Sequence, residues 1–257
     1  MLIDTHAHLN FNAFKNDIDE VIQRSLKNNI WMINIGSNYE TSKKAVEIAE
    51  KYQKGVYAAI GLHPIYKEEN FDFQKYKELA KSKKVVAVGE IGLDYYRRPK
   101  TTKKKEIFKQ KQKELFLKQL ELARELNLPV IFHCRMAHQN LYEILNSKLR
   151  GVIHGFVGTV EELEKYLKLG FSIGFNGMIF KNIERVNFEK LISKTPLKKI
   201  LIETDCPFLT PPPFENQRNE PLYIKYIAEK IAKIKNSNFE KIIRITTENA
   251  KELFKIK

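Results

Sequence analysis

Short runs of apolar, β-branched residues recur along the chain, and each is followed by a longer stretch in which apolar residues return at helical spacing. This alternation indicates buried parallel strands that are joined by helices. The predicted strands are residues 2–4, 32–36, 56–61, 85–89, 130–133, 151–154, 171–174 and 200–203. Helical spacing is evident over residues 39–51, 105–126, 161–169, 221–235 and 239–255. Eight strand-helix units predict an α/β fold, a single (β/α)8 TIM barrel, more naturally than an open sheet.

The length of 257 residues is close to the roughly 250 that are typical of one such barrel. No linker rich in glycine and serine and no internal repeat divides the chain, so we expect one domain over residues 1–257. Residues 97–105 are basic and contain Pro99, and residues 207–221 contain five prolines. We expect both segments to be loops at the end of the barrel where active sites are built.

The charge balance favours a polyanionic partner, because 45 Lys and Arg residues face 31 Asp and Glu, a net charge of +14. A lysine-rich composition without functional meaning explains the same excess equally well. Cys134 and Cys206 make no spaced framework, which fits a reducing compartment. No signal-like segment and no run of membrane-spanning length is present, so we expect a cytoplasmic protein without membrane contact. We also expect a monomer.

Polar side chains lie at the carboxyl ends of five predicted strands, although buried parallel strands are normally apolar. His6 and His8 lie two apart, so both project to the same side of a strand end. In a barrel these strand ends converge, and they bring together His6, His8, Glu90, His133, His154 and Asp205. Each residue alone has an ordinary explanation, a backbone hydrogen bond or a helix cap. Together they exceed what one ion needs, which favours a two-metal site with Glu90 as the bridging carboxylate.

These motifs, taken with others along the chain, resemble the TatD family of metal-dependent deoxyribonucleases, within the wider amidohydrolase-like barrels. The matching segments are DTHAHL at residues 4–9, GLHP at 61–64, GEIGLDYY at 89–96, residues 119–133, HGF at 154–156, ETDCP at 203–207 and RNEP at 218–221. The resemblance implies one metal held by His6, His8, Glu90 and Asp205, and a second held by Glu90, His133 and His154.

The resemblance also implies the chemistry of the site. Family members hydrolyse phosphodiester bonds in DNA, often from the 3′ end of single strands and sometimes in RNA, with Mg²⁺ or Mn²⁺. Zinc is often bound in such sites, and four histidines suit zinc as well as carboxylates suit Mg²⁺, so the two divalent ions expected per chain stay unidentified. Some relatives have been linked to removal of D-amino acids from tRNA.

The chain departs from the family pattern near two predicted ligands. Met136 stands where an acidic residue is common, so a carboxylate expected near the fifth strand is missing. Residues 155–159 read GFVGT, where a small residue and then Phe-Ser-Gly or Phe-Thr-Gly are usual. Neither departure removes a ligand, but each bears on substrate fit or rate.

Four residues are candidates for catalysis. A metal-bridging hydroxide would attack the phosphodiester, with Glu90 bridging the ions and Asp205 orienting the water and accepting its proton. His63 is a candidate for binding phosphate or protonating the leaving oxygen, and a structural imidazole is the alternative. Glu203 shares a strand face with Asp205, so it either contacts substrate, orients a ligand or is a buried paired carboxylate.

Substrate contacts are predicted beside the fourth and fifth strands. Arg135 follows a predicted ligand, and its planar fork suits phosphate, although a rim salt bridge is the alternative. Tyr95 and Arg97 belong to a stretch that combines rings with positive charge, as binders of single strands require. A solvated loop and helix start explains the same stretch. Cys134 and Cys206 are out of alternation with the ligands and are interpreted as packing residues.

The sequence therefore predicts a divalent-metal-dependent phosphodiester hydrolase, a 3′–5′ deoxyribonuclease that acts on single-stranded ends of DNA and also of RNA. The first alternative is a D-aminoacyl-tRNA deacylase, or another ester or amide hydrolase, because the same nucleophile attacks carbonyls and the fold does not discriminate. The second is a nucleic-acid-binding protein with an inert metal site.

Overall fold

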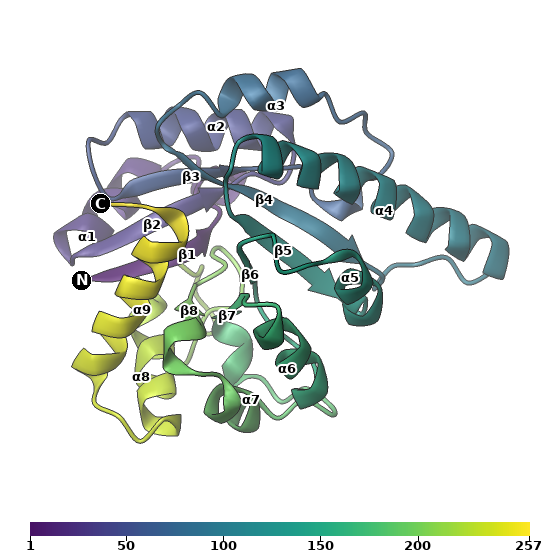
Figure 1. Cartoon of the computed structure of the whole chain (residues 1–257). Coiled ribbons are helices and arrows are strands. Elements are labelled where there is room, and N and C mark those ends of the chain that lie inside the picture. Colours follow the sequence, from purple (N-terminus) through teal and green to yellow (C-terminus); the bar gives the residue numbers. More distant parts are fainter.

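The eight predicted strands are present and lie parallel, in the order of the sequence, in a computed structural model that describes all residues 1–257 (Figure 1). Their bounds are β1 (Leu2–Ala7), β2 (Ile30–Ile35), β3 (Val56–Ile60), β4 (Val85–Asp94), β5 (Val130–Arg135), β6 (Gly151–Ile153), β7 (Ser172–Phe175) and β8 (Ile200–Ile202). Each strand pairs with the next, from β1 with β2 to β7 with β8. The sheet curls into a nearly closed (β/α)8 barrel.

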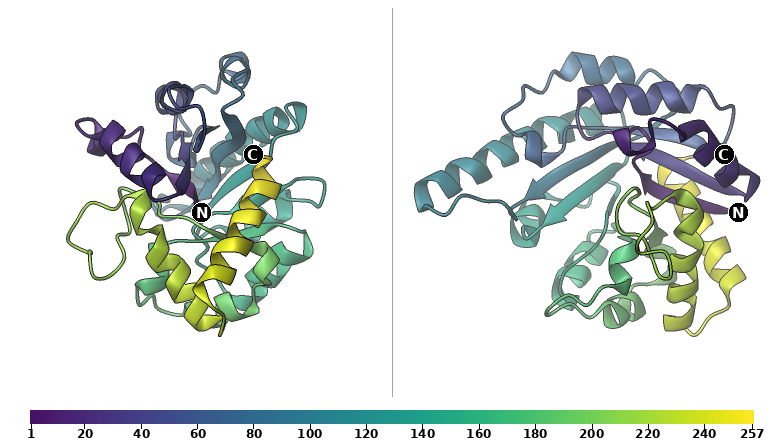
Figure 2. Two further views of the ribbon diagram at one scale, coloured as in Figure 1. Left: turned by 90° about the vertical axis from the view of Figure 1, so that its left-hand side faces the viewer. Right: turned by 180° about the vertical axis from the view of Figure 1, so that it is seen from behind.

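Helices follow the strands and cover the outside of the barrel (Figure 2). The α-helices are α1 (Ile18–Lys27), α2 (Tyr39–Glu50), α3 (Phe73–Leu79), α4 (Thr102–Glu125), α5 (His138–Ile144), α6 (Val160–Lys168), α7 (Phe188–Lys194), α8 (Ile224–Ile234) and α9 (Phe239–Phe254). Short 3₁₀ helices are η1 (Asn12–Phe14), η2 (Pro64–Tyr66), η3 (Gly177–Phe180), η4 (Leu197–Lys199) and η5 (Pro221–Tyr223). None of the helices has the length and apolar character needed to cross a bilayer.

The gap between β1 and β8 is bridged just beyond the end of β8. The Asp205 amide donates to the His6 carbonyl at 2.8 Å, and the His8 amide donates to the Cys206 carbonyl at 2.9 Å. The buried Asp4 carboxylate reinforces this junction, because it accepts from the Thr204 amide at 2.9 Å and from the Thr204 hydroxyl at 2.5 Å. These bonds fix the first and last predicted ligands beside each other.

The interior of the barrel is filled by residues that alternate along the strands, as its period of two requires. Ile3, Ile33, Val152 and Leu201 belong to this inner cluster, which the end of α9 closes with Phe254. Both termini lie at this closed end, since the Thr247 hydroxyl donates to the Met1 carbonyl at 2.8 Å. The opposite end of the barrel, where the strands finish, stays open for a site.

The strands that carry the predicted ligands extend further than their apolar runs. β4 continues to Asp94 rather than ending at Gly89, and β5 continues to Arg135. Gly92 pairs with His133 and Asp94 pairs with Arg135, so the polar residues lie on the strands themselves. The apolar runs of β4 and β5 end before the strands do, because the last residues of these strands lie at the barrel mouth and carry polar side chains.

The expectation of a loop over residues 97–105 is wrong for its second half, because α4 begins at Thr102. Pro99 lies before this start, and lysine has a good helix propensity, so the basic run does not oppose a helix. α4 has 24 residues, and its first turns extend past the barrel (Figure 1). The segment that is rich in proline lacks regular structure until Pro221 opens η5, as the sequence predicts.

Candidate active site

The open end of the barrel brings all six predicted ligands together. His6 lies on β1 and His8 directly follows it, Glu90 lies on β4, and His133 lies on β5. His154 and Asp205 follow β6 and β8. Several three-residue sets drawn from these side chains have ligand atoms within 4.8 Å of one another.

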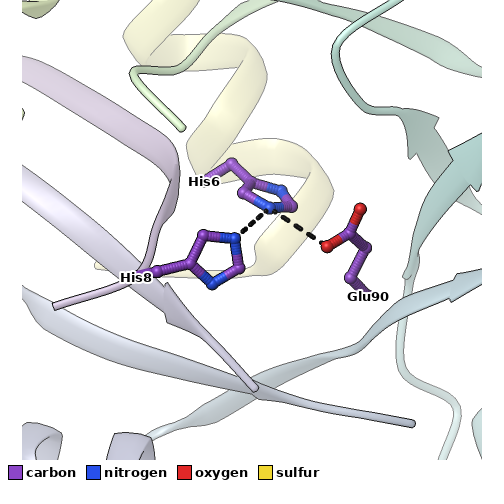
Figure 3. A group of neighbouring side chains, drawn as sticks. All are labelled: His6, His8 and Glu90. Carbon is purple, nitrogen blue, oxygen red and sulfur yellow. Dashed lines mark hydrogen bonds and ion pairs between the residues drawn. The ribbon is translucent and has the colours of Figure 1, made fainter. Parts of the chain in front are cut away.

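The first set of donors surrounds His6. Its Nε2 atom lies 3.1 Å from His8 Nε2 and 3.6 Å from Glu90 Oε2 (Figure 3). The same atom lies 3.8 Å from Asp205 Oδ1. Asp205 Oδ1 lies 3.4 Å from His8 Nε2. Ligands about 2.1 Å from one cation are separated by distances of this size in a tetrahedral arrangement.

The second set uses the other oxygen of Glu90. Its Oε1 atom lies 2.5 Å from His133 Nδ1 and 3.2 Å from His154 Nε2. Because Oε2 faces His6 and Oε1 faces His133 and His154, one carboxylate joins the two sets.

Hydrogen bonds fix the tautomers of two histidines and provide a test of whether this site suits cations. His8 Nδ1 lies 3.0 Å from the Ile35 carbonyl, which only accepts, so Nδ1 carries the hydrogen. His154 Nδ1 lies 2.9 Å from Glu203 Oε1 and donates to that carboxylate. When the rings are neutral, as metal binding requires, the Nε2 lone pairs face carboxylate oxygens. In the metal-free protein the Glu203 and Glu90 carboxylates outweigh burial and raise the pKa of His154 well above its usual value, so a proton supplies the positive charge there. Electron pairs that converge in this way need a cation between them, so the donor set fits metal binding.

Glu203 lies behind His154 and has 1% of its surface exposed, so it is buried rather than open to substrate. Its Oε1 atom also accepts from the Gly155 amide at 2.6 Å and from Asn176 Nδ2 at 3.3 Å. A Cβ atom on Gly174 would lie 2.5 Å from Oε2, so glycine there leaves room for the carboxylate. Glu203 therefore orients His154.

Asp94 plays the matching part for His133 and is absent from the set that the sequence predicts. Its Oδ2 atom lies 3.3 Å from His133 Nε2, on the far side of the ring from Glu90. The sequence signal is its place at the end of the GEIGLD segment, four residues after Glu90, which β4 turns toward the same strand end. Histidine ligands commonly have a carboxylate partner of this kind.

His63 is also close to Glu90, with 3.8 Å between its Nε2 and Glu90 Oε1. Its Nδ1 accepts from the Ile65 amide at 3.1 Å, so the hydrogen sits on Nε2 and points at the ligand cluster. Burial, with the positive field of His133, lowers the pKa of His63 to about 3. His63 is therefore neutral, and it does not line the open cavity.

The two carboxylates of the cluster stay ionised although burial opposes it. Burial alone would raise the pKa of Glu90, but the charges of His154 and His133 and the hydrogen bond from His133 outweigh burial and hold that pKa well below its usual range. The pKa of Asp205 is lowered in the same way, because the neighbouring His8, His154 and His6 outweigh burial. Ionised carboxylates are the form that binds cations.

A cavity of about 510 Å³ opens over the cluster and is lined by His133, His154 and Asp205. Three large apolar side chains on its wall are more than half exposed: Tyr96 at 54%, Met136 at 60% and Phe208 at 53%. Large apolar groups that a fold leaves in solvent around one cavity mark a binding surface.

The predicted substrate residues separate in the structure. The Arg135 guanidinium lines the cavity and stacks on Tyr96, with 3.6 Å between its central carbon and the ring centre. Tyr95 is 5% exposed, packs in the core and does not line this cavity. Arg97 is exposed and lies outside the cavity wall. Alternation along the chain turns Tyr95 inward, which leaves Tyr96 as the ring that faces the site.

The cysteines pack as the sequence predicts, and neither belongs to the candidate ligand sets. Cys134 is 9% exposed at the cavity wall, its Sγ lies 3.2 Å from His138 Nδ1, and burial raises the pKa of Cys134 to about 12. Of the GFVGT segment, Phe156 is buried, Val157 lines the cavity and Thr159 caps α6 by accepting from the Glu162 amide.

A (β/α)8 barrel with two adjoining sets of histidine and carboxylate donors at its strand ends defines a metal-dependent hydrolase. The chain belongs to the family described as TatD related DNase, whose model matches residues 3–255.

Its relatives agree with this assignment. The chain is 42% identical to the uncharacterized metal-dependent hydrolase YabD of Bacillus subtilis, and the match covers 100% of both chains. It is 33% identical to the 3′–5′ ssDNA/RNA exonuclease TatD of Pantoea ananatis, over 98% of this chain and 99% of the relative. The crystal structure of YjjV, a TatD homologue from Escherichia coli, superposes with a TM-score of 0.88 at 30% identity, and covers 100% of this chain and 98% of that one.

Proposed function

We propose that this protein is a 3′–5′ exonuclease that removes nucleotides from single-stranded DNA, and also from RNA ends. The observation that carries the proposal is Glu90, whose two oxygens face two separate sets of donors at the base of an open cavity. The relative from Pantoea ananatis, named for this activity and similar over nearly the whole chain, supports the choice of substrate.

We propose two divalent cations per chain. His6, His8, Asp205 and Glu90 Oε2 hold one, and His133, His154 and Glu90 Oε1 hold the other. Mg²⁺ or Mn²⁺ would serve activity, and Zn²⁺ is compatible with the four nitrogens. When bound, the two cations supply Lewis acidity to the phosphodiester and to the water that attacks it.

Asp205 is the proposed proton acceptor for the attacking water. It is ionised, its side chain is the most exposed of the carboxylates that face the ligand nitrogens, and it lines the cavity from which water and substrate arrive. A base must lie within reach of the proton that it removes, and this position meets that condition.

His63 and Glu203 position other groups in this scheme. Both are almost fully buried, and both contact members of the donor cluster. His63 points its Nε2 hydrogen toward Glu90, and Glu203 holds His154 through the ring hydrogen. We assign these two residues to the geometry of the donors rather than to proton transfer with substrate.

The cavity wall suits an unpaired nucleotide. Arg135 offers a planar, charged donor fork to phosphate, and its stacking on Tyr96 holds the fork in place. Tyr96 and Phe208 are both exposed on this wall, and stacking of a base on an aromatic ring needs a base that is free of a partner strand. This requirement favours single-stranded ends.

The test is digestion of single-stranded DNA that carries a 5′ label, by metal-stripped protein to which Mg²⁺, Mn²⁺ or Zn²⁺ is restored. A ladder that shortens from the 3′ end, and that is lost in the Glu90→Ala variant, is expected. A D-aminoacyl-tRNA assay runs beside it. Release of amino acid with no shortening of DNA or RNA would contradict the proposal and favour the deacylase.

A further inference from the structure

A surface groove leads away from the active-site cavity between α4 and α5. A second hollow of about 530 Å³ adjoins the cavity, because Met136 and His138 line both. A third hollow of about 230 Å³ adjoins the second, and Tyr95, Lys109 and Asn140 line both of these. The three hollows make one path, and we call the second and third together the α4–α5 groove.

Lysines of α4 line this groove at regular intervals. Lys105 and Lys109 line the second hollow, and Lys109 and Lys113 line the third. Residues four apart share one helix face, with about 6 Å between them along the axis. That rise is comparable with the separation of successive phosphates in an extended single strand. Figure 1 shows α4 extending past the barrel mouth, on the side of α5.

The acidic residues of the groove are held by hydrogen bonds, and one of them, Glu106, has a cationic partner. Glu106 accepts from Lys109 at 3.0 Å, and Glu143 accepts from Gln139 at 2.8 Å. Glu162 accepts from the Thr159 amide at 2.8 Å and so caps α6. Lys105 and Lys113 make no ion pair, and Arg98 adds another charge where it lines the second hollow. Four basic side chains, Arg98, Lys105, Lys109 and Lys113, line the groove against the three carboxylates of Glu106, Glu143 and Glu162. The groove therefore has a net charge of +1, and Lys105 and Lys113 are its lysines free of an ion pair.

Met136 forms the ridge between the cavity and the groove. It has a φ of 55° and is 60% exposed, so its side chain stands in solvent between the two hollows. A neutral thioether there places no negative charge in the way of a phosphate chain that crosses the ridge. The thioether also offers a soft, polarizable contact to a base.

We propose that the α4–α5 groove binds the body of the single-stranded nucleic acid, 5′ to the bond that is cleaved. The strand would leave the cavity over Met136 and follow Lys105, Lys109 and Lys113 along α4. This inference rests on the proposed exonuclease function. It adds that affinity rises with strand length until the groove is filled.

The test compares the steady-state kinetics of a dinucleotide and a twelve-nucleotide strand. The variant joins Lys105→Ala, Lys109→Ala and Lys113→Ala. The matched control joins Lys190→Ala, Lys233→Ala and Lys241→Ala, which removes the same charge from exposed positions on α7, α8 and α9. All proteins carry the same restored metal, and kcat/KM is measured at several salt concentrations.

We expect the groove variant to raise KM for the long strand about tenfold. The slope of log kcat/KM against log salt, which is negative, should become less negative by about 2, because three phosphate contacts are lost. KM for the dinucleotide should change less than twofold in that variant. The control should match the wild type on both substrates. An unchanged KM and salt slope for the long strand in the groove variant would overturn the inference, and so would an equal change in the control. If the wild-type protein cleaves neither strand with any metal, the exonuclease function itself fails.

Discussion

The Glu203→Gln substitution removes the negative charge beside His154 and keeps a side chain of the same shape. In the wild type, Oε1 accepts from His154 Nδ1 at 2.9 Å, from the Gly155 amide at 2.6 Å and from Asn176 at 3.3 Å. A glutamine keeps an acceptor oxygen in that place but carries no charge. Glu203→Ala removes the acceptor altogether and leaves the three donors buried without a partner.

The magnitudes follow from this contact set. Hydrogen bonds to a charged acceptor are roughly twice as strong as neutral ones, so glutamine weakens the hold on the His154 ring while keeping its direction. Loss of the carboxylate behind a ligand histidine lowers metal affinity about 10- to 100-fold, or about 1.4–2.7 kcal/mol. The alanine variant also loses stability without metal, because each donor left unsatisfied costs about 1–3 kcal/mol.

The assay has two parts, a competition titration of metal with a fluorescent chelator and thermal unfolding of the metal-free protein. We expect both variants to weaken metal binding, and Glu203→Ala to lower the metal-free Tm by more than Glu203→Gln, which keeps an acceptor for the three donors. Asp94→Asn is the parallel change at His133, and a similar loss is expected from it. Wild-type metal affinity in both Glu203 variants would refute the claim that this carboxylate orients a ligand.

Three further predictions concern residues around the site and the barrel. Gly92→Ala should lower the Tm by roughly 10 °C in calorimetry, because a Cβ atom would lie 2.0 Å from the His133 carbonyl and overpacking of this kind costs about 3 kcal/mol; an unchanged Tm would contradict the register of β4 with β5. Burial raises the pKa of Cys134 to about 12, so Cys134 should resist iodoacetamide at pH 8 in the folded protein and react once urea unfolds it. Modification of Cys134 in the folded protein, detected by mass spectrometry, would contradict its burial. Arg218→Ala should destabilise the protein by at most about 1 kcal/mol at neutral pH, because Arg218 lowers the pKa of Asp17, but the Asp17 side chain is 34% exposed and solvent screens the pair. The contribution of Asp17 is present above an unfolded pKa of about 3.9 and is lost as pH falls through the lower folded pKa, so a Tm difference between variant and wild type that does not shrink between pH 7 and pH 3 would exclude it.

The fold and the ligand sets could be predicted because each depends on a local pattern. Buried parallel strands require apolar runs, and the barrel requires them to recur with helices between, so the eight strands are visible in the sequence. His6, Glu90 and His133 stand out because they interrupt that pattern at the same end of each strand. A charged or polar residue in a strand of this kind needs a reason, and convergence at the barrel mouth supplies it.

The cavity wall was harder to predict because it depends on where loops travel. Tyr95 and Tyr96 are adjacent, and the pattern alone does not say which ring faces the site and which packs in the core. Asp94 lies beyond the end of the apolar run, and its place on the same strand as Glu90 becomes evident only from the full length of β4. Phe208 lies 16 residues before α8 begins at Ile224, in a segment whose path no periodicity sets.

The metal donors and the residues of the cavity wall stand on different parts of the fold. The donors stand on strands whose register is set by backbone pairing, so a change in substrate need not disturb them. Tyr96, Met136 and Phe208 stand on segments that follow β4, β5 and β8, and connecting segments of this kind tolerate change better than the strands of a barrel do. A base that stacks between exposed rings gains energy only when it is free of a partner strand, whereas the donor cluster treats every phosphodiester alike. Preference for single strands should therefore fall when the rings of Tyr96 and Phe208 are removed, while cleavage of a small phosphodiester without a base continues.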